Sequence, residues 1–520
     1  MVRYPIGIQT FSEIRNGGYL YVDKTQQVYD ITSQYKYVFL SRPRRFGKSL
    51  LASTFDSYFR GKKELFEGLA MEHLETEWTE YPVLHFSLDA AKRGTVEDTD
   101  IQIRRQLEKM EREYGMPLGG QDTTSRFQDL VEGLYEKTGR QVVVLIDEYD
   151  APMLTVLHDE ERLELMRTEL QSFYSPLKSL DPYLRFVFIT GITKFSQLSI
   201  FSQINNLEKI SMKRPFATLC GITQEELEAN FQEGIEELGE EYGLSHDEVL
   251  AKLKWKYDGY HFSHRSPGVY NPFSLLSAMK NHDFENYWFA TGTPRFLISQ
   301  IKKYNADITQ LDGSHALATE FDAPTEDMHS ILPLFYQSGY LTIKDYDQLF
   351  DDYTLGFPNE ELKVGLTQMF IPFYVSTDIN KTNTACRQIC KALMEDDIDA
   401  ALKAAQSYFA SIPYQEGTLK DAPTSEGHFT AMLYVMFSFL SLYVWSQVRV
   451  ATGRLDILLK TSSTIYVMEL KLGGTVEEAL QQIDNKGYAI PWQADGRRVV
   501  KVGITFSTTT RTIESWKVKP

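Results

Sequence analysis

The chain has 520 residues, more than the roughly 250–300 at which one hydrophobic core stops growing, so several packed units are expected. With 42% hydrophobic and 24% charged residues it has an ordinary globular composition, which excludes a wholly disordered, fibrous or coiled-coil chain. Its 54 Lys and Arg against 71 Asp and Glu give a formal net charge of −17, which excludes a basic protein that coats nucleic acid mainly by electrostatics.

We expect no targeting signal at the start of the chain. Residues 1–18 (MVRYPIGIQTFSEIRNGG) have no apolar signal core and no cleavage pattern. The three cysteines, Cys220, Cys386 and Cys390, cannot form a disulfide framework, which is typical of the reducing cytosol. Both observations predict a cytoplasmic protein.

Strand and helix patterns alternate in residues 1–215. Short apolar runs are separated by longer segments with helical period, such as Ile101–Tyr114 and Glu160–Tyr174. The apolar runs are Tyr37–Ser41, Pro82–Leu88, Gln141–Asp147 and Arg185–Thr190. Because strands that alternate with helices form parallel crossovers, this region is predicted to be an α/β domain, a parallel sheet with helices on both faces.

Residues 216–375 are predicted to be a mostly helical domain with a winged-helix-like end. Thr223–Leu250 is an acidic stretch with the pattern of an amphipathic, solvated helix. Ser330–Leu341 has the pattern of a helix and turn, and an extended pair follows around Leu341–Tyr346 and Tyr353–Phe357. A helix, a turn and a two-stranded wing together indicate a winged helix.

The last part of the chain is predicted to be a helical connector, residues 376–415, and an α/β domain, residues 416–520. The domain shows a helix, three strands, a helix and a strand, and its 12 Lys and Arg against 10 Asp and Glu make it the part that repels anions least. Phe429–Val448 has no charge and is nominally long enough to span a bilayer. Its polar residues and its change to a β-branched, aromatic pattern favour a buried helix followed by a buried strand.

A phosphate-binding loop is predicted after the first strand. Residues 42–49 (RPRRFGKS) fit the pattern G-x-x-x-x-G-K-[ST] except at the first position, which is Arg42, and a helix at Leu50–Phe59 follows. In such loops the second glycine permits close approach of the backbone, the lysine reaches the β- and γ-phosphates and the hydroxyl ligates Mg²⁺. The predicted nucleotide ligands here are Arg44, Arg45, Gly47, Lys48 and Ser49. The missing first glycine leaves open a site that hydrolyses slowly or waits for a partner.

Two acids and a threonine complete this predicted site. The apolar strand Val142–Ile146 ends in Asp147 and Glu148. Asp147 is expected to hold the metal together with Ser49, and Glu148 to polarise the attacking water. Thr190, at the end of the strand that begins at Arg185, is expected to sense the γ-phosphate. The alternative is three core strands with incidental polar ends.

A second polar cluster is predicted in the C-terminal domain. The strand Gly453–Leu459 contains Asp456, and the next strand, Ser463–Lys471, contains Glu469 and Lys471, which point to one face because they are two residues apart. If the strands pair, two carboxylates and a lysine meet. This arrangement is typical of a metal-dependent phosphodiesterase, with the carboxylates on Mg²⁺ and the lysine on the water or the developing charge. The alternative is a structural ion-pair cluster.

Three further residues are candidates for this second site. Glu426, at the start of the preceding helix, is a candidate metal ligand. Gln482 and Tyr488, on the following helix, are candidate contacts to a nucleic-acid backbone. Each of the three is as well explained by an ordinary structural role.

The chain resembles a known family: bacterial predicted AAA-ATPase-like proteins with a C-terminal PD-(D/E)XK nuclease-fold domain. The motifs that carry the resemblance are YVDKT (21–25), SRPRRFGKS (41–49), LIDEYD (145–150), TGITKFS (190–196), YDGY (257–260), NPF (271–273), GRLD (453–456), ELK (469–471) and the Gln482–Tyr488 stretch. The resemblance implies that Arg42 is a family trait and that the C-terminal domain has a restriction-endonuclease-like fold. The family often has an acid shortly before the GRxD strand, where this sequence has Gln447.

The motifs together predict an ATPase coupled to a DNA endonuclease, with ATP and Mg²⁺ (or Mn²⁺) as cofactors and DNA as the nucleic-acid partner. A homo-oligomer is compatible with this reading, and no membrane partner is expected. The resemblance implies a role in defence or mobile-element biology. One alternative is a nucleotide-dependent switch that binds DNA or protein and uses the nuclease fold without cleavage; another is a nuclease whose ATPase half is a scaffold. The complete Asp456, Glu469 and Lys471 set favours catalysis.

Overall fold

The structure is a computed structural model, and it divides the chain into two compact units. It describes residues 2–89, 94–117, 122–193, 206–289, 300, 311–322, 330–366, 379–411, 426–438, 443–450, 452–507, 509–510 and 512–520. The first unit comprises Met1–Ala306 and Gly313–Asn359, and the second comprises Asp307–Asp312 and Glu360–Pro520.

The first unit is built on a parallel sheet. Its described strands, in the spatial order β2-β3-β4-β1-β5, are β2 (Val83–Ser87), β3 (Val142–Asp147), β4 (Leu184–Gly191), β1 (Tyr37–Ser41) and β5 (Glu208–Lys209). All their pairings are parallel, so their carboxyl ends share one edge of the sheet. Every residue of β1 and β3 is buried, as expected for strands covered on both faces.

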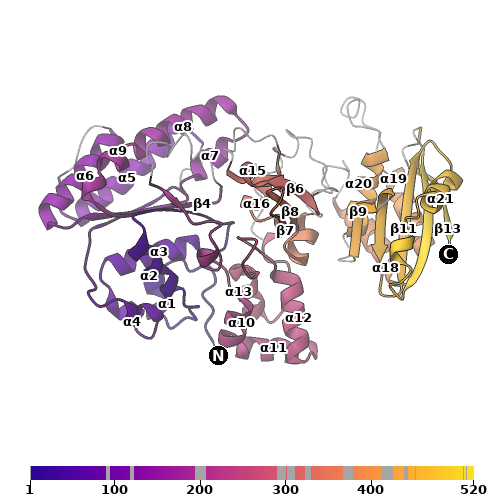
Figure 1. The fold of residues 1–520 in the computed structure, drawn as a ribbon, viewed down its shortest axis with the longest axis horizontal. Coiled ribbons are helices and arrows are strands. Elements are labelled where there is room, and N and C mark those ends of the chain that lie inside the picture. Colours follow the sequence, from indigo (N-terminus) through magenta and orange to yellow (C-terminus); the bar gives the residue numbers. More distant parts are fainter. Residues whose placement is uncertain are drawn as a thin grey trace. The chain divides into compact units, whose positions relative to one another are not determined.

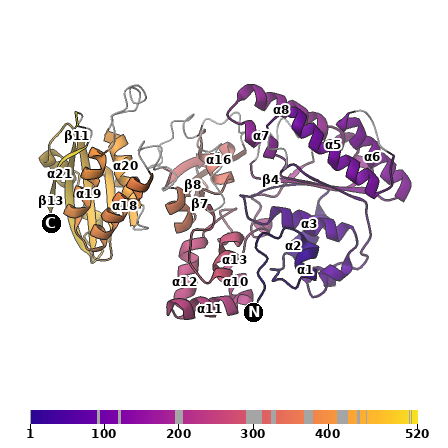
Figure 2. The same cartoon turned by 180° about the vertical axis from the view of Figure 1, so that it is seen from behind.

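Helices cover both faces of this sheet, as Figures 1 and 2 show: α3 packs against one face, with α1, α2 and α4 on the same side, and α5 to α9 lie on the other. They are α1 (Phe11–Asn16), α2 (Thr25–Gln34), α3 (Lys48–Phe59), α4 (Ala70–Leu74), α5 (Val96–Glu113), α6 (Thr123–Thr138), α7 (Ala151–Val156), α8 (Glu160–Tyr174) and α9 (Pro176–Ser179). Short 3-10 helices are η1 (Lys63–Phe66), η2 (Asp181–Tyr183) and η3 (Arg214–Phe216). The predicted α/β architecture is confirmed.

The middle region belongs to the same unit as far as Asn359, apart from Asp307–Asp312. Its first part is a group of helices, α10 (Gln224–Asn230), α11 (Gln232–Tyr242), α12 (His246–Tyr257) and α13 (Pro272–Asn281), which share a core that includes Leu227, Ile235, Leu253 and Leu275. Its second part comprises β6 (Ser314–Leu317), α15 (Ala318–Asp322), α16 (Leu332–Gln337), β7 (Thr342–Asp347) and β8 (Asp352–Gly356). The predicted helix and hairpin are present, and β6 adds a third antiparallel strand beside β8 that the sequence pattern did not indicate.

The second unit contains a mixed sheet. Its described strands, in the order β13-β12-β11-β10-β9, are β13 (Ile513–Lys519), β12 (Arg498–Phe506), β11 (Thr464–Leu472), β10 (Gly453–Lys460) and β9 (Tyr443–Val450). Only β11 and β12 pair in parallel, and α21 (Val476–Asn485) crosses between them, followed by the 3-10 helix η7 (Ile490–Trp492). The α/β fold expected for this part of the chain is confirmed, and β13 is a further strand that the sequence pattern did not indicate.

Helices α18 (Ile379–Met394) and α19 (Ile398–Ala410) belong to this second unit rather than standing apart from its sheet. Gln406 Nε2 donates to the carbonyl oxygen of Ile513 at 2.7 Å, and Trp516 Nε1 donates to Asp399 at 2.7 Å. The turn between the two helices also holds the β10–β11 hairpin, because the hydroxyls of Thr461 (2.7 Å) and Ser463 donate to the carboxylate of Asp396.

The uncharged stretch Phe429–Val448 forms the helix and strand expected of it. Residues Glu426–Ser438 form α20, Tyr443–Val450 form β9, and residues 439–442 between them lie outside the described residues. Phe429 stacks on Phe506 of β12 with ring centroids 4.4 Å apart, and Leu433 and Phe437 are fully buried. Among the residues that the structure describes, no helix is long and apolar enough to cross a membrane.

Candidate functional site

The phosphate loop, residues 42–47, lies between the end of β1 and the start of α3. Gly47 is the N-cap of α3 and has a φ of 85°, a left-handed conformation that glycine adopts without strain. Lys48 is buried, and its Nζ donates to the carbonyl oxygen of Pro43 at 3.1 Å. The lysine is therefore folded back over the loop, next to the free amides of the helix N-terminus that favour anions.

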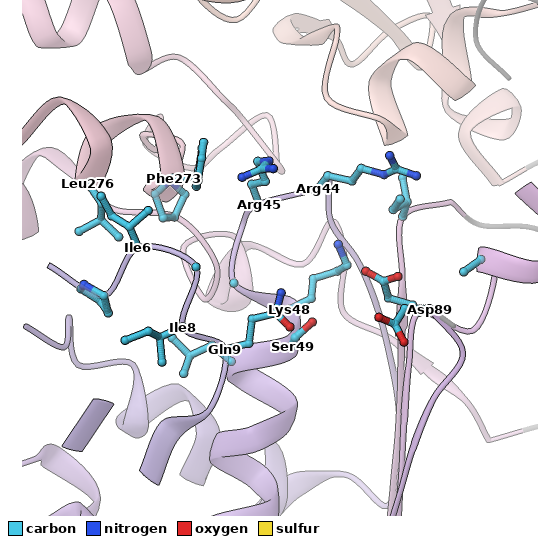
Figure 3. Close-up of a pocket in the computed structure, with 18 of the residues that line it drawn as sticks. Ile6, Ile8, Gln9, Arg44, Arg45, Lys48, Ser49, Asp89, Phe273 and Leu276 are labelled. Atoms are coloured by element: carbon cyan, nitrogen blue, oxygen red, sulfur yellow. The ribbon is translucent and has the colours of Figure 1, made fainter. Parts of the chain in front are cut away.

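A cavity of about 1200 Å³ lies next to this loop (Figure 3). Small-molecule sites typically measure ~300–1,000 Å³, so the cavity is large enough for a nucleotide. The loop and α3 line it with Arg44, Arg45, Gly47, Lys48 and Ser49, and acids line it with Asp89, Glu148 and Asp150. Its apolar wall comes from the N-terminal segment and α13, with Ile6, Ile8, Phe273 and Leu276. A cationic wall beside an apolar one fits a phosphorylated ligand that carries a base.

The acids at the end of β3 share one buried environment. Burial, together with the neighbouring carboxylates of Asp147 and Asp150, raises the pKa of Glu148 above its ordinary value, although Lys48 opposes the shift. Glu148 itself has a φ of 52°, an uncommon conformation that turns the chain at the end of the strand. The carboxyl ends of β1 and β3 are separated only by β4, so the acids and the phosphate loop meet at the same sheet edge.

Asp150 and Asp89 are cavity residues that the sequence analysis missed. Asp150 is 1% exposed and accepts hydrogen bonds from the backbone N–H of Thr193 at 2.7 Å and from its hydroxyl at 2.5 Å. It thereby ties the turn after β3 to the end of β4. The signal was available, because Asp150 follows Asp147 and Glu148 in the motif DEYD and Asp89 follows the strand β2 at the same edge.

Two predicted residues of this site, Asp147 and Thr190, are not among the residues that line the cavity. Thr190 is fully buried, and its hydroxyl donates to the carbonyl oxygen of Leu40 at 2.8 Å. It does not line the cavity, so its position does not support the predicted sensing of the γ-phosphate. Arg42 points away from the cavity and is buried against the middle region.

The second cluster lies on β10 and β11 of the C-terminal sheet. Pairing of Ile457 with Met468 places Asp456 beside Glu469. Asp456 is 8% exposed, and its Oδ2 accepts a hydrogen bond from the backbone N–H of Leu470 at 2.9 Å. Lys471 Nζ lies 3.3 Å from Glu469 Oε1, and Glu469 is 2% exposed. The structure thus brings together the three residues that the sequence pattern singled out.

The oxygen ligands of this cluster fit a magnesium ion. Mg²⁺ typically binds through one or two carboxylates and keeps several waters, and Asp456 and Glu469 supply two buried carboxylates with a cationic neighbour. Within the described residues there is no group of three or more His, Cys, Asp or Glu that could hold a metal. The side chain of Glu426 lies outside the described residues, so its role as a further ligand stays a prediction.

Gln482 and Tyr488 differ from each other in what they contact. The side-chain amide of Gln482 donates to Glu469 Oε1, so Gln482 orients a residue of the cluster. Tyr488 is 2% exposed and packs in a core with Leu455 and Ile483. Neither position supports the predicted contact to a nucleic-acid backbone, since one amide is directed at Glu469 and the tyrosine ring is inside the fold.

Comparisons with known proteins agree with this division into two sites. Residues 5–201 match the family model described as predicted AAA-ATPase, and residues 424–516 match the model of the PD-(D/E)XK nuclease superfamily. The chain is also similar to an uncharacterised protein of the vnfD 5′ region of Azotobacter chroococcum mcd 1, with 33% identity over 529 residues. That match covers 99% of this chain and 99% of the relative.

Proposed function

Since the chain belongs to the family that joins a predicted AAA-ATPase domain to a PD-(D/E)XK nuclease-superfamily domain, we propose that it is an ATP-hydrolysing protein coupled to a Mg²⁺-dependent DNA endonuclease. The observation that carries the proposal is the meeting of Asp456, Glu469 and Lys471 on adjacent strands of the nuclease-superfamily part. Two buried carboxylates share this cluster with the ammonium of Lys471, so the three side chains carry one negative charge in excess, which a divalent cation would balance.

In the ATPase part, this chain's own residues bind and orient the nucleotide. Lys48 and Arg44 face the cavity and supply charge for the phosphates. Ser49, which lines the cavity, and Asp147, which is buried at the end of β3 beside it, would hold the Mg²⁺ that accompanies ATP. Glu148 lines the same cavity and would take the proton from the attacking water. The apolar side chains on the opposite wall would exclude water from the base.

In the nuclease part, Asp456 and Glu469 would hold the metal, which when bound activates water and stabilises charge on the scissile phosphate. Lys471 places a positive charge beside that oxygen cluster, and Gln482 fixes the orientation of Glu469. We propose defence or mobile-element biology as the setting, a suggestion supported by the family resemblance alone.

The decisive experiment is a cleavage assay with purified full-length protein. Plasmid, linear duplex, single-stranded DNA and RNA would be incubated with Mg²⁺ in the absence of nucleotide and with ATP or ADP. We expect DNA cleavage that stops with EDTA and that differs between nucleotide states, because allosteric coupling is typically worth ~1–3 kcal/mol. If no substrate is cut under any of these conditions, the nuclease proposal is wrong.

The alternative is a nucleotide switch that binds a partner without cutting. One observation bears on the partner: the β7–β8 hairpin carries Asp345, Asp347, Asp351 and Asp352, and at its tip Leu349 and Phe350 are 83% and 68% exposed. An acidic, apolar tip repels phosphates, so in this alternative the middle region would bind protein rather than DNA. Retained DNA binding without cleavage would favour the switch.

Replacement of Lys48 should weaken ATP binding. Lys48→Ala removes the ammonium that faces the phosphates, so we expect the affinity for ATP·Mg²⁺ to fall at least ~10-fold, about 1.4 kcal/mol. Isothermal titration calorimetry at constant ionic strength measures this directly. Lys137→Ala, a change at an exposed lysine of the same unit, is the matched control. Equal affinities of wild type and Lys48→Ala would show that the nucleotide site is misassigned.

A smaller effect is expected at Gln482. Gln482→Ala removes the amide that orients Glu469, and loss of a residue that supports a metal ligand typically costs ~10–100-fold in activity. DNA cleavage should fall by that factor, and raising the Mg²⁺ concentration should restore part of it. Gln481→Ala, at the exposed neighbouring position, is the control. Identical cleavage by the two variants would contradict a positioning role for Gln482.

A further inference from the structure

Several residues of the phosphate loop do not face the cavity but reach the middle region. The loop as a whole meets two motifs of that region: YDGY at 257–260, which the proposed chemistry leaves without a role, and NPF at 271–273, whose Phe273 lines the cavity. Both the loop and these motifs belong to the first compact unit.

Arg42, which stands where phosphate loops usually have glycine, is the most enclosed of these residues. It is 1% exposed, and its Nη1 donates to the carbonyl oxygens of Ser41 at 2.9 Å and Ser211 at 2.7 Å, while Nη2 donates to Phe216 at 3.0 Å. Its guanidinium lies 4.1 Å from the ring centroid of Phe262. Burial of a charged group is costly unless its hydrogen bonds are satisfied. The buried guanidinium of Arg42, with its hydrogen bonds to three carbonyl oxygens and its ring contact, therefore fixes the position of this end of the loop.

The other end of the loop is held by aromatic contacts. Phe46 is 1% exposed, and its ring lies 4.8 Å from that of Tyr260 and 5.2 Å from that of Phe262, both edge to face. Arg42 and Phe46 therefore fix both ends of the loop to the same short segment of the middle region, residues 260–262.

Pro43 and Arg45, which lie between Arg42 and Phe46 in the loop, make contacts that a bound nucleotide would change. Pro43 lies so close to Gly339 that a Cβ on that glycine would be 2.6 Å from the proline Cβ. Arg45 lies 3.8 Å from the ring centroid of Phe273, which itself lines the cavity, as Figure 3 shows. Lys48 Nζ donates to the carbonyl oxygen of Pro43 and has two further N–H donors for a phosphate, so a phosphate bound there would pull on Pro43 through the lysine, and it would also attract the guanidinium of Arg45.

The NPF motif forms the start of α13, next to the contact between Arg45 and Phe273. Asn271 is fully buried and caps α13, its side chain accepting from the backbone N–H of Ser274 at 3.1 Å, and Pro272 occupies the first turn. The helix that carries Phe273 thus begins at the cavity wall. Phe273 lies in the first turn of α13, so a shift of its backbone would reach the helix directly.

We propose that Arg42 is a positioning residue that holds the phosphate loop against the middle region, so that nucleotide binding is transmitted to that region through Pro43 and Arg45. This proposal rests on the proposed binding of ATP. Because Arg42 and Phe46 keep the ends of the loop in place, the rearrangement caused by a phosphate cannot be absorbed within the loop. It passes to Gly339 and Phe273 instead.

The test measures backbone hydrogen exchange of full-length protein with and without a saturating non-hydrolysable ATP analogue. In the wild type we expect the analogue to slow exchange in residues 257–262 and 334–342, which do not line the cavity, by ~10-fold, within the ~5–150-fold range of allosteric coupling. Arg42→Gly restores the usual loop glycine and should keep protection at residues 47–52 while losing it in both middle segments. Arg44→Gly, the matched control, should bind more weakly but at saturation keep protection in the middle segments.

If the role of Arg42 is purely structural, Arg42→Gly should lower the stability of the protein, and protection by the analogue should change in the same way at residues 47–52 and in the middle segments. If Arg42→Gly does not fold, Phe262→Leu, which keeps the arginine and removes its ring partner, must show the same loss. Calorimetry on the wild type separates failure of the proposal from failure of the ATP assignment. The proposal is overturned if the wild type binds nucleotide and its middle segments are not protected. It is also overturned if a folded Arg42→Gly or Phe262→Leu variant shows full protection there. A wild type that binds no nucleotide would contradict the ATP assignment on which the proposal rests.

Discussion

Replacement of Asp456 by alanine is expected to lower the rate of DNA cleavage by at least ~10²-fold, the size of effect seen when a group that stabilises transition-state charge is removed. Asp456 and Glu469 are the carboxylates that would hold the metal among the described side chains of this cluster, and the hydrogen bond that Asp456 accepts from the backbone N–H of Leu470 links β10 to β11. Glu469→Ala and Lys471→Ala should cause losses of the same order. The measurement is the initial rate of plasmid nicking at fixed Mg²⁺.

Asp456→Asn removes the negative charge of the side chain but keeps its size, whereas Asp456→Ala removes both, so comparison of the two variants separates the two effects. The amide oxygen can still accept from Leu470 N–H, so the strand pairing should survive while the metal ligand is weakened. ATP binding should be unchanged in all these variants, because the nucleotide cavity belongs to the other compact unit. Glu514→Gln, at an exposed acid of the same sheet, is the control. If Asp456→Asn cleaves at the wild-type rate, the activity does not come from this cluster.

Replacement of Glu148 by glutamine should abolish ATP turnover while leaving ATP binding intact. The amide has the size of the carboxylate but cannot take a proton from water, and loss of a general base typically costs ~10²–10⁴-fold. Phosphate release measures the rate, and calorimetry measures binding. Glu136→Gln, at an exposed helix position of the same unit, is the control.

The pH dependence gives a second check on Glu148. Burial and the neighbouring acids raise the pKa of Glu148 above its ordinary 4.5, and the residue acts as a base only when deprotonated. Hydrolysis by the wild type should therefore decline, as pH falls, at a higher pH than an ordinary glutamate would require, and the residual activity of Glu148→Gln should lack this acidic decline. Full turnover in Glu148→Gln would show that another group activates the water.

The strands that carry the sites could be predicted because their signals are local. The run Tyr37–Ser41 coincides with β1, and the ELK motif falls on β11, where Asp456 was expected to meet it. An apolar run that ends in polar residues is visible in any short window. The two-residue strand β5, the short strand β6 and the largely exposed strand β13 were missed because they carry no such run.

The roles of single side chains were harder to predict, because their partners are distant in sequence. In the sequence, Arg42 is only a departure from the phosphate-loop pattern. Its contacts to Ser211 and Phe262, which are distant in the chain, are visible only in the structure. Thr190 reads as a sensor at a strand end, but its side chain is directed to β1 instead of the cavity. The alternation of side chains along a strand shows which residues share a face of the sheet. Only the folded structure shows which other residues that face contacts.

The hold of Asp396 on the β10–β11 hairpin has a consequence for how this chain can vary in length. The hydroxyls of Thr461 and Ser463 both reach that single carboxylate, so the hairpin cannot gain or lose a residue and keep both bonds. A shift of one residue in β11 would also turn Glu469 and Lys471 to the opposite face of the sheet. Homologues that cut DNA should therefore tolerate insertions and deletions in other connections of this unit, whereas an indel at 461–463 should mark a homologue that has lost catalysis even when every catalytic residue is still present.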